Sequence, residues 1–299
     1  MNKLKPKVLV VGASGLLGGA LVRNLEGEFE VYGTYLRNKP SGISKIYRLD
    51  ASNDEELENL FRNHSFDFVI NCSGLTSVDE CEKRPEASWI LNGYVPAKIA
   101  SLLESSSGFF TNISTDHFYS VDLRPRTETE DVRAINQYGY AKLFAEEAVL
   151  SINPSSAVIR TNFFGLGKKN GASLLDFAKC TIEKNGSLVG FTDIEFSPIG
   201  TSYLSSALSK FLQNPQPGIW NISSTEVISK YEFLKLVAKA LNKDSSRILK
   251  GRIVDQTSLA LRPSYLALNP SKFNKYFDTI APSIEEMISA ELRSGSCEF

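Results

Sequence analysis

Two residues in the segment Asn136–Lys142 have the types and the spacing needed for acid–base chemistry. Tyr138 and Lys142 are four residues apart, so on a helix they project from the same face. A phenol has a reference pKa of about 10, and a fixed ammonium beside it favours the phenolate and lowers that pKa. Tyr138 is therefore a candidate proton donor and Lys142 the group that tunes it, whereas Tyr140 points away from their shared face. The same spacing also fits an amphipathic surface helix, so the prediction needs a cofactor site and a suitable fold.

A glycine-rich turn near the N-terminus is the candidate cofactor site. The apolar run Lys7–Val11 predicts a strand, Gly12–Gly18 a tight turn, and the pattern that follows a helix. Glycine suits such a turn because a Cβ would block both the backbone conformation and the approach of a pyrophosphate to the helix N-terminus. The spacing is G-x-x-G-x-x-G and not the G-x-G-x-x-G of the common dinucleotide fingerprint. A glycine turn that binds nothing is the alternative.

Four further strand ends carry polar or small residues. Strands are predicted at Glu30–Tyr35, Ile46–Leu49, Asp67–Asn71 and Phe109–Ile113. Open α/β sheets bind ligands outside the carboxyl ends of their strands, so the residues that follow are placed for function. Those residues are, in chain order, Arg37, the pair Asp50-Ala51, the run Cys72-Ser73-Gly74 and the run Ser114-Thr115-Asp116.

The residue after the second strand bears on the choice of cofactor. An acid there holds the ribose 2′-hydroxyl of NAD, whereas an arginine accommodates the 2′-phosphate of NADP. Arg37 is present and no acid ends the strand Glu30–Tyr35, which favours NADP(H) and leaves NAD(H) possible. A solvated loop arginine is the alternative, since arginine is mostly exposed in proteins.

The alternation of strands and helices predicts the fold class. Strands up to Ala157–Arg160 alternate with helices, one of them over Pro85–Leu103 with an expected kink at Pro96. This pattern predicts a right-handed, doubly wound parallel α/β sheet. We expect residues 1–164 to form a dinucleotide-binding Rossmann domain. Residues 165–299 are expected to form mainly a smaller α/β substrate-binding lobe, with some later segments returning to the main sheet.

Composition excludes several classes of function. The chain of 299 residues has 33 basic and 34 acidic residues and no block of like charge, which argues against nucleic-acid binding. The four cysteines form no C-x-x-C pair and the two histidines offer no zinc-ligand spacing, so no metal is expected. The basic start and the uncharged run Val8–Val22 resemble a secretory signal, but its glycines and shortness argue against a signal helix or a membrane span. We expect a cytoplasmic protein with reduced thiols and a small-molecule ligand.

Together these residues resemble the extended short-chain dehydrogenase/reductases and, within them, the dTDP-4-dehydrorhamnose reductase family. The glycine turn, Asp50, Thr115, Tyr138 and Lys142 carry the general part of the resemblance. The more specific part is the run Asn71–Glu82, which is similar to that family's Asn-Ala-Ala-Ala-Tyr-Thr-x-Val-Asp-x-x-Glu segment. Further matches are Ser114-Thr115-Asp116, Arg160-Thr161 and Arg262-Pro263.

The resemblance implies NADPH-dependent reduction of the 4-keto group of a nucleotide-linked deoxyhexose, for surface polysaccharide or glycoside synthesis. Tyr138 would protonate the developing alkoxide, Thr115 would hydrogen-bond the carbonyl oxygen, and Lys142 would also hold the nicotinamide ribose. A homodimer is implied as well. The cofactor-binding residues would be Gly12, Ser14, Gly15, Leu16, Leu17, Arg37, Asp50, Ala51, Cys72, Ser73, Gly74, Thr76, Tyr138 and Lys142, and the substrate-binding residues Asp116, His117, Asn162 and Arg262.

The departures from the family pattern lie on the substrate side. His117 follows Asp116 where the family usually has tyrosine, and the segment Asn162–Phe164 lacks an expected tryptophan. His117 can be a substrate contact, a second proton donor or a solvated loop histidine. An epimerase or dehydratase of nucleotide sugars stays open, as does a non-catalytic regulatory subunit like the beta subunit of methionine adenosyltransferase. Retention of the threonine, tyrosine and lysine together favours an enzyme.

Overall fold

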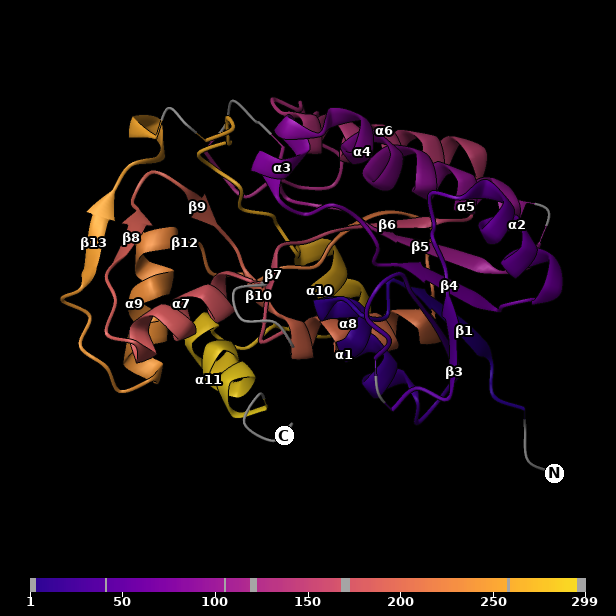
Figure 1. Cartoon of the computed structure of the whole chain (residues 1–299), viewed down its shortest axis with the longest axis horizontal. Coiled ribbons are helices and arrows are strands. Elements are labelled where there is room, and N and C mark those ends of the chain that lie inside the picture. Colours follow the sequence, from indigo (N-terminus) through magenta and orange to yellow (C-terminus); the bar gives the residue numbers. More distant parts are fainter. Residues whose placement is uncertain are drawn as a thin grey trace. The chain divides into compact units, whose positions relative to one another are not determined.

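The chain forms two compact units that interleave along the sequence (Figure 1). The computed structural model describes residues 4–40, 42–104, 106–118, 123–167, 173–256 and 259–294. Unit 1 comprises Met1–Ser114, Asn136–Ile159 and Ser205–Trp220, and unit 2 comprises Thr115–Ile135, Arg160–Leu204 and Asn221–Phe299. The predicted boundary between functional domains at residues 164 and 165 stays a prediction.

Unit 1 is built on a seven-stranded sheet. Its strands are β1 (Lys7–Val11), β2 (Glu30–Tyr35), β3 (Lys45–Arg48), β4 (Phe68–Asn71), β5 (Phe109–Ile113), β6 (Ala157–Arg160) and β11 (Gly218–Asn221), in the spatial order β11-β6-β5-β4-β1-β2-β3. Strands β1 to β6 are joined by parallel pairings. The order reverses at β1, which lies between β2 and β4, and such a reversal is the place where doubly wound sheets bind ligands. The predicted doubly wound parallel fold is confirmed.

Helices cover both faces of this sheet (Figure 1). They are α1 (Leu16–Leu25), α2 (Asp54–Asn63), α3 (Val78–Lys83), α4 (Pro85–Trp89), η1 (Ile90–Tyr94), α5 (Val95–Glu104), α6 (Gln137–Ile152) and α8 (Thr201–Gln213). Leu57 of α2, Ile99 of α5 and Val149 of α6 share one apolar core with the sheet. On the other face the ring centroid of Phe211 in α8 lies 6.1 Å from that of Phe109 in β5. The inner strands are therefore buried on both sides, which explains their continuous apolar runs.

The helical segment 85–104 contains an irregular turn. Helix α4 passes into η1, a π-helical turn, and η1 passes into α5. Pro96 is the second residue of α5 and has no N–H to donate to the preceding turn. The π turn lies just before Pro96, and such turns are often found at functional sites. The kink expected at Pro96 itself stays a prediction. The π turn places Asn92 in the interior of unit 1.

Unit 2 consists of short paired strands and of helices. Its pairs are β7 (Phe163–Phe164) with β10 (Ile199–Gly200), β8 (Leu188–Phe191) with β13 (Ile248–Gly251), and β9 (Glu195–Phe196) with β12 (Ile228–Ser229). Its helices are α7 (Leu174–Glu183), α9 (Lys230–Ala240), α10 (Ser271–Phe277), α11 (Ile284–Ser294) and the 3-10 turn η2 (Ile253–Asp255). The ring of Phe233 in α9 packs against Phe164 and Phe196, with centroids 5.0 and 5.7 Å apart. In the part of the chain that the structure describes, no helix has the length and apolarity required to cross a membrane.

Gly18 and Gly19 provide a matched test of the packing of the glycine turn. A Cβ on Gly18 would overlap the carbonyl oxygen of Gly12 and lie 2.9 Å from the Cα of Ala13, whereas the nearest described atom to a Cβ on Gly19 is 3.6 Å away. We expect Gly18→Ala to lower the free energy of unfolding by about 1–3 kcal/mol, because the backbone must shift. Gly19→Ala should leave it unchanged or raise it by up to about 1 kcal/mol, since alanine is the better helix former. Denaturant unfolding measures both, and a Gly18→Ala protein as stable as the wild type would contradict the close packing.

Candidate functional site

Helix α6 carries Tyr138 and Lys142 on its buried face. The side chain of Asn136 accepts a hydrogen bond from the Gly139 amide at 2.8 Å and so fixes the start of the helix. Tyr138 and Lys142 are both buried, whereas Tyr140 is 55% exposed. The two candidate residues therefore share the inward face, as their spacing predicts, and Tyr140 lies on the outward one.

Lys142 occupies a desolvated position at the carboxyl end of β5. Its Nζ donates a hydrogen bond to the carbonyl oxygen of Ile113 at 3.0 Å. Burial lowers the pKa of Lys142 to about 8, and the carboxylate of Glu146 opposes that shift. Because this value remains above 7, the side chain is an ammonium near neutral pH and can stabilise a phenolate or another anion beside it.

The glycine turn, the end of β4 and Lys142 approach one another closely within unit 1. Gly12 has a φ of +84°, a region that favours glycine, and a Cβ there would lie 3.0 Å from the Ser73 amide nitrogen. Gly74 has a φ of +156°, and a Cβ there would lie 3.7 Å from Nζ of Lys142. The structure thus brings the two predicted cofactor segments together and places the second beside the candidate lysine.

Helix α1 begins directly after the glycine turn. In the described residues no side chain caps it at Gly15, so the first amides of the helix are available to an anion. Leu17 is buried in the core, which leaves its backbone as the part that a ligand could reach, whereas Ser14 is exposed and Leu16 is half-buried. These positions fit the pyrophosphate of a dinucleotide.

A buried asparagine holds the loop after β4. The side chain of Asn92 accepts a hydrogen bond from the Leu75 amide at 3.1 Å and donates one to the Leu75 carbonyl at 2.9 Å. Before the loop, Oδ1 of Asn71 accepts the Ser73 amide at 3.1 Å. A Cβ on Gly74 would lie 2.5 Å from Oδ1 of Asn92, so this position requires glycine. Asn92 belongs to the π turn and holds the loop after β4 through these hydrogen bonds. The hydrophobic periodicity of the sequence does not reveal this role.

The remaining cofactor candidates lie after other strands. Arg37 and Thr76 are exposed, whereas Asp50 and Ala51 are half-buried. The Asp50 amide donates to Oε2 of Glu56 at 2.9 Å, which holds the segment after β3 against α2. Since β2 and β3 are neighbours in the sheet, the residues that follow them share one edge of it.

In unit 2, Thr115, Asp116 and Asn162 come together. Oγ1 of Thr115 accepts a hydrogen bond from the His117 amide at 3.1 Å, and Oδ2 of Asp116 accepts one from Nδ2 of Asn162 at 2.6 Å. Burial raises the pKa of Asp116 to about 6, although Lys230, Asn162 and Arg126 oppose the shift. Asp116 thus titrates closer to neutral pH than an exposed aspartate does.

His117 is buried, which corrects its interpretation as a solvated loop histidine. The residue is 8% exposed. Burial, together with the positive charges of Arg262, Lys230 and Arg126, lowers the pKa of His117 to about 3. The imidazole is therefore neutral near pH 7, which removes the imidazolium form that a second proton donor would use. In the sequence His117 belongs to a polar loop. Its burial depends on the tertiary fold and could not be predicted from the composition of that loop.

Two cations near these residues were not expected from the sequence. Arg126 is buried and donates hydrogen bonds to the backbone carbonyls of Asp116 and Tyr265 at 2.6 and 3.2 Å. Lys230 begins α9, and its Nζ lies 3.3 Å from the ring centroid of Phe196. Desolvation lowers the pKa of Lys230 to about 8. Both lie in segments whose composition is that of ordinary loops and caps, and only the tertiary fold brings them to Asp116.

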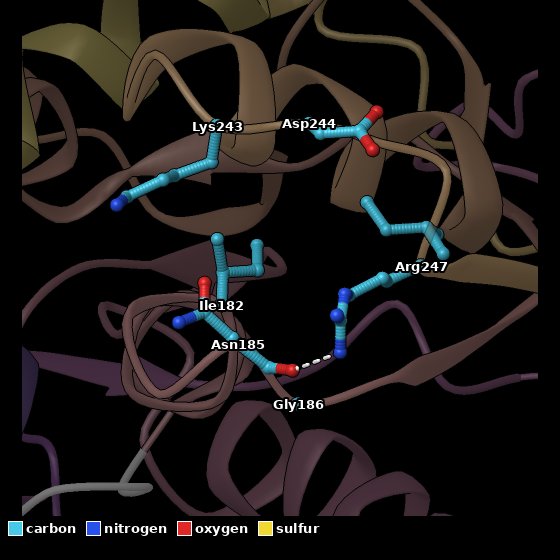
Figure 2. Close-up of a pocket in the computed structure, with 7 residues that line it drawn as sticks. Ile182, Asn185, Gly186, Lys243, Asp244 and Arg247 are labelled. Carbon is cyan, nitrogen blue, oxygen red and sulfur yellow. Dashed lines mark hydrogen bonds between the residues drawn. The ribbon is translucent and has the colours of Figure 1, made fainter.

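A small pocket in unit 2 does not involve the predicted residues (Figure 2). It lies where Asn185 and Gly186, after α7, face the segment Lys243–Ile248. Nη1 of Arg247 donates to the carbonyl oxygen of Asn185 at 2.6 Å and bridges the two walls. None of the lining residues is a predicted site residue.

No metal site is found in the described ranges, where no three histidine, cysteine, aspartate or glutamate side chains cluster. Cys72, Cys81 and Cys180 are free. Cys297 lies outside the described residues.

Comparison with known proteins identifies the family. The family model described as "RmlD substrate binding domain" matches residues 6–296. The chain belongs to this family. It is 26% identical over 286 residues to the Haloferax volcanii protein named "Probable low-salt glycan biosynthesis reductase Agl14", covering 94% of this chain and 95% of that one. It is also 28% identical over 251 residues to methionine adenosyltransferase 2 subunit beta of Xenopus tropicalis, covering 81% of this chain and 74% of the relative.

A solved member of the same fold carries a dinucleotide. The crystal structure of dTDP-4-dehydrorhamnose reductase from Bacillus anthracis in complex with NADP matches with a TM-score of 0.85 and 21% identity, over 98% of this chain and 100% of that one. The predicted membership of the extended short-chain dehydrogenase/reductases is confirmed. The relatives named dTDP-4-dehydrorhamnose reductase agree with the predicted class of enzyme, an NAD(P)-dependent oxidoreductase. The assignments of individual site residues stay predictions.

Replacing His117 should reduce the amount by which the free energy of unfolding falls as the pH is lowered. In the unfolded chain a histidine titrates near pH 6.5, whereas His117 in the folded protein resists protonation to about pH 3. The unfolded state therefore binds more protons between these values, and stability falls as the pH falls, by up to about 1.4 kcal/mol per pH unit. We expect His117→Asn to lose less stability than the wild type between pH 6.5 and pH 4.5 in denaturant unfolding. His64→Asn, at a half-exposed position, is the control, and equal slopes for His117→Asn and the wild type would refute the burial of a neutral imidazole.

Proposed function

We propose that the chain uses NADPH to reduce the 4-keto group of a nucleotide-linked deoxyhexose, for surface polysaccharide or glycoside synthesis. The observation that carries the proposal is the buried ammonium of Lys142, one helical turn from Tyr138 and beside the glycine of the loop after β4. A buried cation that lies beside a glycine loop and one helical turn from a phenol suits proton transfer to a bound ligand. The sugar class comes from the relatives, among them dTDP-4-dehydrorhamnose reductases.

The residues of unit 1 fit a dinucleotide cofactor. A Cβ at Gly12 would fill the space next to Ser73, and α1 presents free amides behind this turn. Pyrophosphate oxygens would accept hydrogen bonds from these amides. Arg37, exposed after β2, would pair with the 2′-phosphate of NADP(H). Bound in this way, the cofactor supplies the hydride.

Three side chains would divide the remaining work. Tyr138 gives its hydroxyl proton to the carbonyl oxygen as that oxygen gains charge. Lys142 stabilises the phenolate that Tyr138 becomes and hydrogen-bonds the nicotinamide ribose. The oxygen of Thr115 accepts the His117 amide, and its hydroxyl donates to Oδ1 of Asp116 across a long 3.5 Å contact. Thr115 would exchange this contact for a hydrogen bond to the substrate carbonyl. Donors aimed at a developing oxyanion are among the largest contributions to catalysis.

Two alternatives each have one supporting observation. Asp116 directly follows Thr115, and its pKa is raised to about 6, which suits the additional acid that a nucleotide-sugar dehydratase would use, although His117 stands where such an enzyme would have a glutamate. The likeness to methionine adenosyltransferase 2 subunit beta supports a non-catalytic regulatory subunit. In that case Tyr138 and Lys142 would bind a dinucleotide without turnover.

Tyr138→Phe is the direct test of the reductase mechanism. We expect purified protein to oxidise NADPH in the presence of a nucleotide-linked 4-ketosugar, followed by absorbance at the nicotinamide band. Loss of the general acid should reduce kcat about 10²–10⁴-fold while NADPH binding persists. Tyr140→Phe removes the same hydroxyl from the exposed face of the helix and should keep the full rate. An undiminished rate in Tyr138→Phe would sink the mechanism, whereas NADPH binding without turnover on a broad ketosugar panel would favour the regulatory subunit.

Arg37→Ala tests the preference for NADPH. Loss of a charge-assisted contact to the 2′-phosphate should weaken NADPH binding roughly 10–100-fold and leave NADH binding nearly unchanged. Titration of the apoprotein with each cofactor, followed by fluorescence, measures the two dissociation constants. Arg62→Ala removes a charge from the outer surface of α2 and serves as the control. Equal weakening of both cofactors in Arg37→Ala would rule out the 2′-phosphate role.

A further inference from the structure

A buried acid on α6 has no part in the site described so far. Glu146 is 1% exposed and follows Lys142 by four residues. The hydroxyl of Ser114, the residue after β5, donates a hydrogen bond to Oε1 of Glu146. Tyr138, Lys142 and Glu146 thus occupy positions i, i+4 and i+8, one stripe along the inward face of the helix.

This position would ordinarily take an apolar residue. Its neighbours on the inward face, Ala145 and Val149, are fully buried, and a carboxylate is costly to bury unless it is paired or hydrogen-bonded. A residue that served only packing would not need a charge. Ser114 supplies a hydrogen bond to the carboxylate, and Lys142 supplies an opposite charge one turn away.

Several groups from neighbouring elements face the Lys142 ammonium and could supply negative charge to it. The end of β5 contributes the Ile113 carbonyl, and the end of β4 and α3 contribute the thiols of Cys72 and Cys81. Burial raises the pKa of Cys72 to about 12 and also raises the pKa of Cys81, so both thiols are neutral near pH 7.

Further titratable groups near this end of α6 lie on the helix itself and on α3. On α6 itself lie the phenol Tyr138 and the carboxylate Glu146. Glu82 of α3 accepts the backbone amide of Gln137 at 2.6 Å and so acts on the start of the helix. Among the groups that act on Lys142, Glu146 opposes its desolvation most strongly.

We propose that Glu146 is a positioning residue that keeps Lys142 in its ammonium form, and that Ser114 holds the Glu146 carboxylate in place for this task. The inference rests on the proposed function, because the charge of Lys142 is what would act on Tyr138 and on the nicotinamide ribose. Desolvation alone drives the lysine toward the neutral amine. The carboxylate of Glu146, on the next turn of the helix, reverses part of that effect because an opposite charge favours the charged form of the lysine.

Direct titration of Lys142 tests the proposal without any substrate. The protein is labelled with ¹³Cε-lysine, the Lys142 signal is assigned through Lys142→Arg, and its chemical shift is followed by NMR from pH 6 to pH 11. We expect Glu146→Gln to lower the midpoint by about one pH unit or more. From the wild-type value of about 8, such a change leaves roughly half of Lys142 neutral at pH 7. Gln keeps an oxygen for the Ser114 hydroxyl, so the variant removes the charge and preserves the hydrogen bond.

Glu147→Gln is the matched control. Glu147 is the next residue of the same helix and is exposed, so the variant makes the same change in charge on the outward face. We expect the Lys142 midpoint to stay within about 0.3 pH unit of the wild type, because exposed charges are screened by solvent. Equal midpoints in Glu146→Gln and Glu147→Gln would overturn the proposal.

Two further measurements separate the possible failures. If circular dichroism shows that Glu146→Gln does not fold, Glu146→Asp is the variant that tests the proposal. It shortens the side chain by one methylene and keeps the charge, so it should lower the Lys142 midpoint by a smaller amount. An unchanged midpoint would overturn the proposal. In the reductase assay, kcat should fall at high pH as Lys142 loses its proton. In Glu146→Gln this fall should begin at a lower pH than in the wild type, by the same shift as the NMR midpoint. A wild type that reduces no ketosugar would refute the proposed function, while the NMR midpoints would still decide the role of Glu146.

Discussion

The buried ammonium of Lys142 is the constraint on which the rest of unit 1 depends. A cation out of water needs acceptors and opposite charge, and unit 1 provides the Ile113 carbonyl at 3.0 Å and the Glu146 carboxylate. The loop after β4 also passes beside Nζ, where a Cβ on Gly74 would lie 3.7 Å from it and would clash with Oδ1 of Asn92 at 2.5 Å. The same constraint explains why α6 needs a precise start, which Asn136 fixes by capping. The glycine turn after β1 packs against the residues that follow β4.

Unit 2 meets the opposite electrostatic problem. Its segment Thr115–His117 lies in the field of Arg126, Lys230 and Arg262. Asp116 is the carboxyl group that faces two of these cations, and its own pKa is raised by burial. His117 stays neutral in this field and does not add to the positive charge. A surplus of positive charge supports a ligand that carries phosphate, which agrees with the nucleotide-linked substrate of the proposed function.

Much of the fold could be predicted from the sequence because local signals and tertiary structure agree. The strands at Lys7–Val11, Glu30–Tyr35 and Phe109–Ile113 have the bounds that their apolar runs predict. The shared face of Tyr138 and Lys142 follows from helical geometry alone. What could not be predicted depends on contacts between distant segments. The burial of His117, the approach of Arg126 and Lys230 to Asp116, and the hydrogen bond from Ser114 to Glu146 have no signature in composition or periodicity.

The interleaving of the two units constrains how the protein can be made. The chain passes between units after Ser114, Ile135, Ile159, Leu204 and Trp220. On the ribosome, the sheet of unit 1 cannot gain its last strand until β11 has emerged, by which time two of the three segments of unit 2 have already been synthesised. Neither unit corresponds to a continuous stretch of the gene, so neither can be released by a single cut or transplanted as one piece. A fragment that contained all of either unit would therefore also contain segments of the other.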